Sequence, residues 1–194
     1  PLLKPEQVAY ILRDCNVRIL VTARDRAALL ETALADCPDL HTLVLTEEAV
    51  PTPQRPRHWQ ILDWSTLLSA ANGPPPARII DLDMAAILYT SGSTGKPKGV
   101  VLSHRNLLTG AHSVAEYLGN RPDDRILAVL PFSFDYGLSQ LTTAFVAGAR
   151  AVLMDYLLPR DVINTVAREG ITGLAAVPPM WVQLAALEWP AAAA

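Results

Sequence analysis

The sequence has few charged residues, few aromatic residues and almost no cysteine. Charged residues make up 18% of the 194 residues and aromatic residues 6%, and the formal net charge at pH 7 is −3. So little basic charge gives no broad positive surface, which argues against a protein that binds nucleic acid or an anionic membrane surface. Hydrophobic residues make up 51%, which excludes a disordered chain and predicts a well-buried interior.

Long apolar runs and targeting signals are also missing. No run reaches the roughly 18 residues that a membrane-spanning helix needs, and residues 1–5 lack the layout of a signal peptide. Cys15 and Cys37 form no CxxC motif and have no histidine at ligand spacing. We interpret them as ordinary thiols of a cytoplasmic protein and predict no metal site. Because the chain starts without Met and ends in the alanine tract 191–194, we expect a piece of a longer protein, with a fold incomplete at both ends.

Short apolar segments alternate with helix-forming segments along most of the chain. The patterns predict strands over 17–21, 42–45, 59–62, 100–102, 125–130, 150–154 and 172–177, and a strand or short helix over 85–89. They predict helices from Pro5, over 27–35 and 64–71, from about Ser103, over 139–146 and 159–168, and from Pro178. Such alternation is typical of an α/β fold, in which a mostly parallel sheet is flanked by helices. Pro-rich stretches at 51–56 and 73–76 indicate a surface loop and a linker, which divides the chain into segments 1–76 and 77–194.

The segment from Tyr89 to Gly99 reads Tyr-Thr-Ser-Gly-Ser-Thr-Gly-Lys-Pro-Lys-Gly. Its hydroxyl groups are small hydrogen-bond donors, its glycines permit close backbone approaches, and its lysines add positive charge. Together these features favour a loop that holds a polyphosphate. A solvated linker is the alternative, but the segment lies between two strongly apolar stretches. It is not a Walker A motif, because Lys96 is followed by Pro97 and a strand is predicted next.

Residues 89–106, which continue through Leu102-Ser-His-Arg-Asn106, resemble the phosphate-loop signature of the adenylate-forming (ANL) superfamily. This superfamily contains AMP-forming acyl-CoA synthetases, amino-acid-adenylating domains of peptide synthetases, and luciferases. Weaker similarity extends over nearly all of the chain, which implies the N-terminal domain of an adenylate-forming ligase. The string from Leu130 to Leu138 also resembles acyl-CoA ligases encoded with bacterial exosortase and exopolysaccharide systems.

The resemblance implies that the carboxylate of an acid attacks the α-phosphate of ATP, and that a thiol of CoA or of a carrier pantetheine then displaces AMP. It further implies that the loop binds the β- and γ-phosphates and stabilises the charge on the departing pyrophosphate. Lys98 is the candidate catalytic residue, and Lys96 faces either the phosphates or the solvent. The nucleotide-binding candidates are Thr90, Ser91, Gly92, Ser93, Thr94, Gly95, Lys96 and Lys98.

The segment from Leu130 to Gly137 lies where the family places one wall of the acid pocket. Many acyl-CoA ligases have a Pro-x-x-His pattern there, but this chain has Phe134 in place of the histidine. Asp135 matches the Asp of the Phe-Asp-x-Ser pattern, which binds the substrate ammonium in amino-acid-adenylating domains, whereas Gly137 replaces the Ser. Asp135 contacts the substrate or caps the next helix. Phe134, Asp135 and Gly137 are the substrate-binding candidates.

The later motifs of the family are not in this sequence, among them the Tyr-Gly-x-Thr-Glu stretch that supplies the expected magnesium ligand. We therefore expect the Mg²⁺ ligand outside this chain, and no pyrophosphate release by the chain alone. The leading hypothesis is an acid:CoA ligase that acts on a small-molecule carboxylic acid, such as a fatty acid, with CoA or an acyl carrier protein as acceptor. An amino-acid-adenylating domain and a non-catalytic nucleotide-binding or scaffold domain are the alternatives.

Overall fold

The computed structural model describes residues 3–47, 59–70, 73, 78–90 and 97–190. The chain divides into two compact units, one formed by residues 1–78 and 89–98 and the other by residues 79–88 and 99–194. The Pro-rich stretch 51–56 and residues 74–76 of the predicted linker lie outside the described residues. No helix in the described part of the chain is long and apolar enough to cross a membrane.

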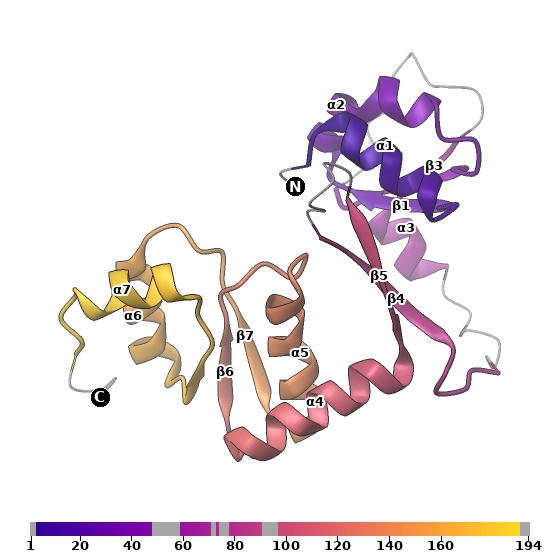
Figure 1. Ribbon diagram of the computed structural model, residues 1–194. Coiled ribbons are helices and arrows are strands. Elements are labelled where there is room, and N and C mark those ends of the chain that lie inside the picture. The colour runs from indigo at the N-terminus through magenta and orange to yellow at the C-terminus, as the bar shows by residue number, and fades with distance from the viewer. Residues whose placement is uncertain (1–2, 48–58, 71–72, 74–77, 91–96, 191–194) are drawn as a thin grey trace. The chain divides into compact units, whose positions relative to one another are not determined.

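The first unit is a parallel three-stranded sheet with helices packed on it (Figure 1). Its elements are α1 (Pro5–Asp14), β1 (Ile19–Thr22), α2 (Arg24–Ala35), β2 (Thr42–Leu45), β3 (Gln60–Asp63) and α3 (Trp64–Ser69). The strands pair in the order β1-β2-β3. Because successive side chains of a strand point to opposite faces, Leu43 and Leu45 share one face, where they pack with Leu12 of α1 and Leu34 of α2.

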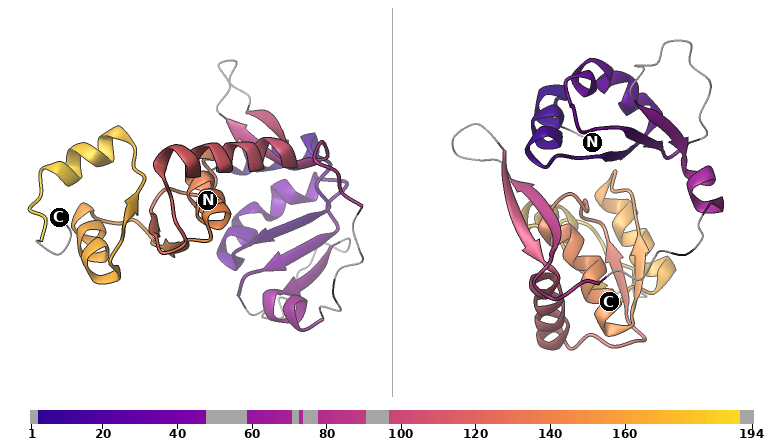
Figure 2. Two further views of the ribbon diagram at one scale, coloured as in Figure 1. Left: turned by 90° about the horizontal axis from the view of Figure 1, so that it is seen from below. Right: turned by 90° about the vertical axis from the view of Figure 1, so that its right-hand side faces the viewer.

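The second unit is a parallel sheet covered by helices on both faces (Figure 2). Its elements are α4 (His104–Leu118), β6 (Arg125–Ala128), α5 (Asp135–Ala147), β7 (Arg150–Leu153), α6 (Pro159–Glu169), β8 (Gly173–Leu174) and α7 (Pro178–Ala185). The strand order is β7-β6-β8, with all neighbours parallel. Leu127 of β6 packs with α6 and α7, while α5 contacts β6 and β7 and packs on α4.

Strands β4 (Met84–Thr90) and β5 (Lys98–Ser103) pair with each other and lead into and out of the glycine-rich segment. The α/β fold predicted from the sequence is confirmed, and the segment 85–89 is a strand. The strand after the glycine-rich segment is also confirmed, so the arrangement differs from the strand–loop–helix of a Walker A motif.

Several boundaries were predicted wrongly. Helix α2 begins at Arg24 rather than at 27, β1 covers Ile19–Thr22 rather than 17–21, and β6 ends at Ala128 rather than at 130. Helix α5 begins at Asp135 rather than at 139, because a buried glutamine and the close approach of Gly137 to Pro131 support an early first turn. Strand β8 covers only two residues rather than 172–177, because β6 pairs with Gly173 and Leu174 alone. In contrast, α6 matches its prediction, starting at Pro159 and ending before Gly170, which has a left-handed φ of 60°.

Candidate functional site

The glycine-rich segment is described at its two borders. Thr90 ends β4 and Lys98 begins β5, and both residues are exposed. Lys98 forms no ion pair with any described residue. Its ammonium group is therefore not neutralised by a carboxylate of the described part of the chain. Ser91, Gly92, Ser93, Thr94, Gly95 and Lys96 lie outside the described residues.

Tyr89, which precedes Thr90, contacts the end of α1 within the first unit. Its hydroxyl group donates a hydrogen bond to Oδ2 of Asp14 and lies 3.2 Å from Sγ of Cys15. Burial and the hydrogen bond to Asp14 raise the pKa of the Tyr89 phenol above its ordinary value, so the proton is retained. One side chain thus fixes the beginning of the glycine-rich segment to a helix 75 residues earlier in the chain.

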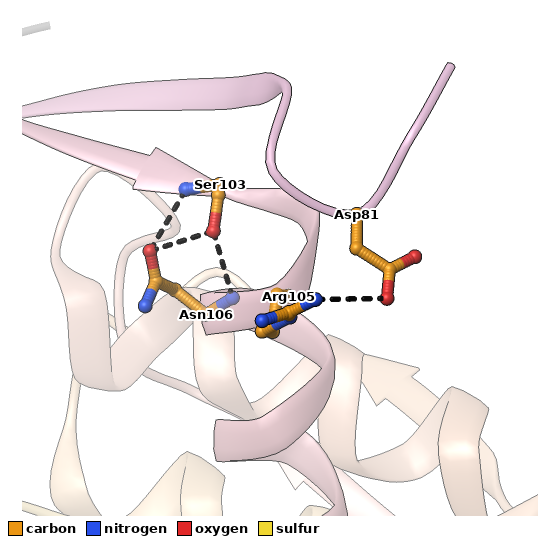
Figure 3. Close-up of polar contacts among 4 residues, drawn as sticks. All are labelled: Asp81, Ser103, Arg105 and Asn106. Atoms are coloured by element: carbon orange, nitrogen blue, oxygen red, sulfur yellow. Dashed lines mark hydrogen bonds and ion pairs between the residues drawn. The ribbon is translucent and has the colours of Figure 1, made fainter. Parts of the chain in front are cut away.

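The start of α4 is held by hydrogen bonds from the protein itself (Figure 3). Ser103 and Asn106 form a reciprocal capping box, in which the N–H of Asn106 donates to Oγ of Ser103 at 3.2 Å and the N–H of Ser103 donates to Oδ1 of Asn106 at 3.0 Å. The next two amides donate to backbone carbonyls, His104 to Asp83 at 3.1 Å and Arg105 to Asp81 at 2.8 Å.

These hydrogen bonds satisfy the first backbone N–H groups of α4, which would otherwise be free to bind a phosphate. The helix start after β5 is therefore not a free anion site. The guanidinium of Arg105 also lies 3.7 Å from the carboxylate of Asp81, and both side chains are largely exposed. These contacts give His104 and Arg105 a role at the start of the helix.

Phe134 and Asp135, two of the substrate-binding candidates, lie at the start of α5. Phe134 is the N-cap residue, and its side chain makes no capping hydrogen bond. Its ring packs edge to face against that of Tyr136, with the ring centroids 6.4 Å apart. Asp135 is the first helical residue, and its Oδ1 accepts a hydrogen bond from the N–H of Tyr136 at 2.8 Å. The alternative that Asp135 is the N-cap is thus wrong, although its charge suits the first turn of a helix. Phe134 and Asp135 are both exposed.

Gly137, the third substrate-binding candidate, is buried one turn into α5. A Cβ atom there would lie 2.6 Å from the carbonyl carbon of Pro131 and 3.1 Å from the carbonyl oxygen of Leu130. In this backbone geometry no other residue fits, so the position differs from the Ser of the Phe-Asp-x-Ser pattern.

Gln140 also lies in this region, and the motif comparison did not indicate it. Its side chain is 4% exposed and hydrogen-bonds the main chain of Val129, Leu130 and Gly137. Helical spacing could have indicated it, since positions 137, 140 and 144 share the buried face of α5.

A cavity of about 270 Å³ lies beside these residues in the second unit. Tyr136 and Gln140 line it, whereas Phe134, Asp135 and Gly137 do not. None of its lining residues, all of them described, carries a charge. They come from α4 and the turn after it, from α5, and from β6, β8 and the residues flanking β8: Val114, Tyr117, Leu118, Asn120, Tyr136, Ser139, Gln140, Thr143, Ile126, Thr172, Gly173, Leu174 and Ala175.

The described residues contain no group of three or more His, Cys, Asp or Glu side chains that could hold a metal ion. Because Mg²⁺ at a nucleotide site is held by only one or two carboxylates together with phosphates, this finding does not locate its ligand, and the position of that ligand outside this chain stays a prediction.

Comparison with known proteins identifies the family of this chain. The chain is 30% identical over 193 residues to a linear gramicidin synthase of Brevibacillus parabrevis, a match that covers 98% of this chain and 2% of that protein. It is 32% identical over 179 residues to sulfoacetate–CoA ligase of Cupriavidus necator, covering 91% of this chain and 33% of the ligase. The anthranilate CoA ligase AuaEII, solved in complex with anthranoyl-AMP, superposes with a TM-score of 0.84 at 26% identity, covering 96% of this chain and 36% of that one.

The chain thus spans about a third of the CoA ligases that it matches and a small part of the gramicidin synthase. The structural match confirms the predicted fold, that of the N-terminal domain of adenylate-forming ligases. The family of AMP-binding enzymes matches residues 1–194. The resemblance drawn from the glycine-rich segment is therefore confirmed, and the chain belongs to the AMP-binding enzyme family.

Proposed function

We propose that the protein is an acid:thiol ligase that uses ATP to activate a carboxylic acid as an acyl-AMP and then transfers the acyl group to a thiol. In the first step a carboxylate oxygen attacks the α-phosphorus of ATP, and the bond to pyrophosphate breaks. In the second step the thiolate of CoA or of a carrier pantetheine attacks the acyl carbon, and AMP leaves. Among the relatives, sulfoacetate–CoA ligase and the anthranoyl-AMP complex carry names that fit these two steps.

The observation that carries this proposal is the exposed Lys98, which has no carboxylate partner among the described residues and borders the glycine-rich segment. An unpaired lysine beside hydroxyl groups can neutralise the charge that grows on departing pyrophosphate. The amides at the start of α4 already have partners, so the lysine and the loop are the groups left for this role. In the proposal, Lys98 is the catalytic residue, and Thr90, Ser91, Ser93 and Thr94 bind the phosphates.

Exchange between labelled pyrophosphate and ATP, measured on the complete gene product with a pool of acids, tests the proposal. The complete product is used because the chain spans only about a third of its CoA ligase relatives. The change Lys98→Ala should lower acid-dependent exchange by about 10²-fold, the loss expected when one group that stabilises transition-state charge is removed. Lys98→Arg should retain more activity because the charge remains.

Arg105→Ala is the control, since it removes an exposed cation at the start of α4 that pairs with Asp81. Exchange in this variant should stay within twofold of the wild type. If the wild-type product shows no exchange with any acid and Lys98→Ala leaves its biological role intact, the chain is a non-catalytic nucleotide-binding or scaffold domain instead.

The acid in this proposal has an uncharged acyl group, such as a fatty acid, rather than an amino acid. The cavity beside Tyr136 has no charged lining residue, and Gly137 departs from the amino-acid-adenylating pattern. The exposed Asp135 favours the alternative, since its carboxylate could bind an ammonium group. Exchange with fatty acids and amino acids in separate reactions decides between them. If Asp135→Ala abolishes exchange with an amino acid, the alternative is correct.

ATP and Mg²⁺ are the proposed nucleotide and cation, CoA or a carrier protein is the proposed acceptor, and a cytoplasmic location is part of the same proposal. Thioester formation, measured with either CoA or a pantetheinylated carrier as the only thiol present, decides which acceptor is used.

A further inference from the structure

A single buried side chain joins the end of β6 to the start of α5. Gln140 is one of three buried polar residues in the described part of the chain, together with Thr143 and Thr165. A carboxamide costs free energy to bury unless its hydrogen-bonding groups are satisfied. The hydrogen-bond partners of the Gln140 carboxamide therefore explain how this side chain can be buried.

The carboxamide of Gln140 uses its full hydrogen-bonding capacity on main-chain groups. Its Oε1 accepts from the N–H of Val129 at 3.1 Å and from that of Leu130 at 3.4 Å. Its Nε2 donates to the carbonyl of Leu130 at 3.2 Å and to that of Gly137 at 2.8 Å. A side-chain amide has two acceptor sites and two donor hydrogens, so none remains for a ligand.

The bonded groups lie where strand pairing has stopped. The pairs of β6 with its neighbours end at Ala128, and Val129 and Leu130 follow directly. Gln140 thus continues the hydrogen bonding of β6 by two residues and connects it to the first turn of α5.

Leu130 and Gly137 also bracket the acid-side segment 131–136, which contains Phe134 and Asp135. The segment is itself compact, because the N–H of Phe134 donates to the carbonyl of Pro131 at 3.1 Å. One carboxamide and the packing of Gly137 against Pro131 therefore hold both ends of the segment relative to β6.

We propose that Gln140 is a positioning residue for the acid: through its four main-chain hydrogen bonds it places segment 131–136 for acid binding, and it has no hydrogen-bonding group left to offer the acid itself. This inference rests on the proposed function. Because Gln140 touches neither nucleotide nor phosphate in this role, its loss should affect the acid and leave ATP binding unchanged.

Two variants separate the parts of this network. Gln140→Met keeps the length of the side chain and removes all four hydrogen bonds. Gln140→Glu keeps the two acceptor bonds to Val129 and Leu130, but its carboxylate cannot donate to the carbonyls of Leu130 and Gly137. Gln140→Glu also serves as the variant to measure if Gln140→Met does not fold.

Two controls change buried residues elsewhere in the chain. Thr165→Val alters a buried polar residue of α6, and Leu34→Ala removes a side chain that is 0% exposed in α2 of the first unit. Both should lower thermal stability. Neither should change the KM for the acid by more than twofold.

The test measures the KM for acid and for ATP in pyrophosphate exchange by the complete gene product. Gln140→Met should raise the KM for the acid at least tenfold and Gln140→Glu at least threefold, while the KM for ATP changes less than twofold. Hydrogen exchange of the Val129 and Leu130 amides should become at least tenfold faster in Gln140→Met and stay slow in Gln140→Glu.

An unchanged acid KM in Gln140→Glu, or an increase no larger than in the two controls, would overturn the positioning role while leaving the proposed function in place. A parallel rise in the KM for ATP would also overturn it, because the defect would then be general. Absence of exchange by the wild-type product with every acid would remove the proposed function and this inference together.

Discussion

Gly137 packs directly against the carbonyl group of Pro131, so that a Cβ atom at position 137 would lie 2.6 Å from the Pro131 carbonyl carbon and overlap its oxygen. Both partners in this contact are backbone, which cannot move aside as the end of a flexible side chain can. We therefore expect Gly137→Ala to lower the free energy of unfolding by about 1–3 kcal/mol, the cost typical of overpacking a buried site. Urea unfolding of the complete gene product measures it.

Gly110, in the exposed part of α4, is the matched control, since no atom lies within 4 Å of a Cβ added there. The same change to alanine should raise the free energy of unfolding by about 0.5–1 kcal/mol, because glycine is unfavourable inside a helix. Equal effects of the two changes would mean that Gly137 is not in close contact with Pro131.

At the start of α4, the hydrogen bonds of Ser103 should matter more for stability than the ion pair of Arg105. Removing the hydroxyl group by Ser103→Ala leaves the N–H of Asn106 without its partner and should cost about 1 kcal/mol. Arg105→Ala should cost less than about 0.5 kcal/mol, because the pair with Asp81 is solvent-exposed and 3.7 Å long. Thermal unfolding at low and high salt compares them, and a larger, salt-sensitive loss in Arg105→Ala would contradict this order.

The hydroxyl group of Tyr89 should stabilise the contact with α1 at neutral pH and lose this effect in alkali. Its pKa is raised in the folded state, so its contribution is fully present below the ordinary tyrosine pKa of about 10 and declines as the pH rises above it. Tyr89→Phe, which removes the bonds to Asp14 and Cys15, should cost about 0.5–1.5 kcal/mol at pH 7.

Spectrophotometric titration of the five tyrosines measures this effect. In the wild type one phenol should ionise only when the protein unfolds, and this delayed phase should be missing in Tyr89→Phe. If both proteins titrate identically, the hydroxyl of Tyr89 is solvated rather than bound to Asp14.

The sequence predicted elements best where a local signal coincides with a tertiary contact. The apolar run 42–45 became β2 with the predicted bounds, because it is the central strand of its sheet and pairs on both sides. Helix α6 followed from Pro159 at its start, the buried spacing of Val162 and Val166, and the glycine after its end. In these cases propensity and packing favour the same structure.

Prediction failed where contacts of side chains and backbone, rather than the hydrophobic pattern, decide the local structure. The pattern predicted a helix from 139, yet α5 begins at Asp135, where Gln140 binds the carbonyl of Gly137 and the glycine fits against Pro131. At the candidate site, the motif predicted roles for Thr90 and Lys98 from their neighbours in sequence, and these roles stay predictions. The partners of Tyr89 and Gln140 follow only from the folded chain, since they come from α1 and from the end of β6.

Asp124, in the turn before β6, should make the stability of the second unit sensitive to acid. The N–H of Arg121 at 2.7 Å and then the hydroxyl of Thr172 at 2.8 Å hold the pKa of its carboxyl below the ordinary value. The contribution is therefore fully present above the ordinary aspartate pKa of about 4 and is lost as the pH falls through the lower folded-state pKa. Asp124→Asn should lower the free energy of unfolding by about 1 kcal/mol at pH 7, the worth of a typical hydrogen bond, and the difference from wild type should shrink below pH 4.

Asp123→Asn is the control for the loss of charge, because exposed Asp123 forms no hydrogen bond or ion pair with any described residue. Urea unfolding of the three proteins between pH 3 and pH 7 measures the difference. If Asp124→Asn and Asp123→Asn follow the same curve, Asp124 acts only through its charge. A difference that grows below pH 4 would mean that the folded state binds the protonated form of Asp124 better, opposite to the direction that its hydrogen-bond donors impose.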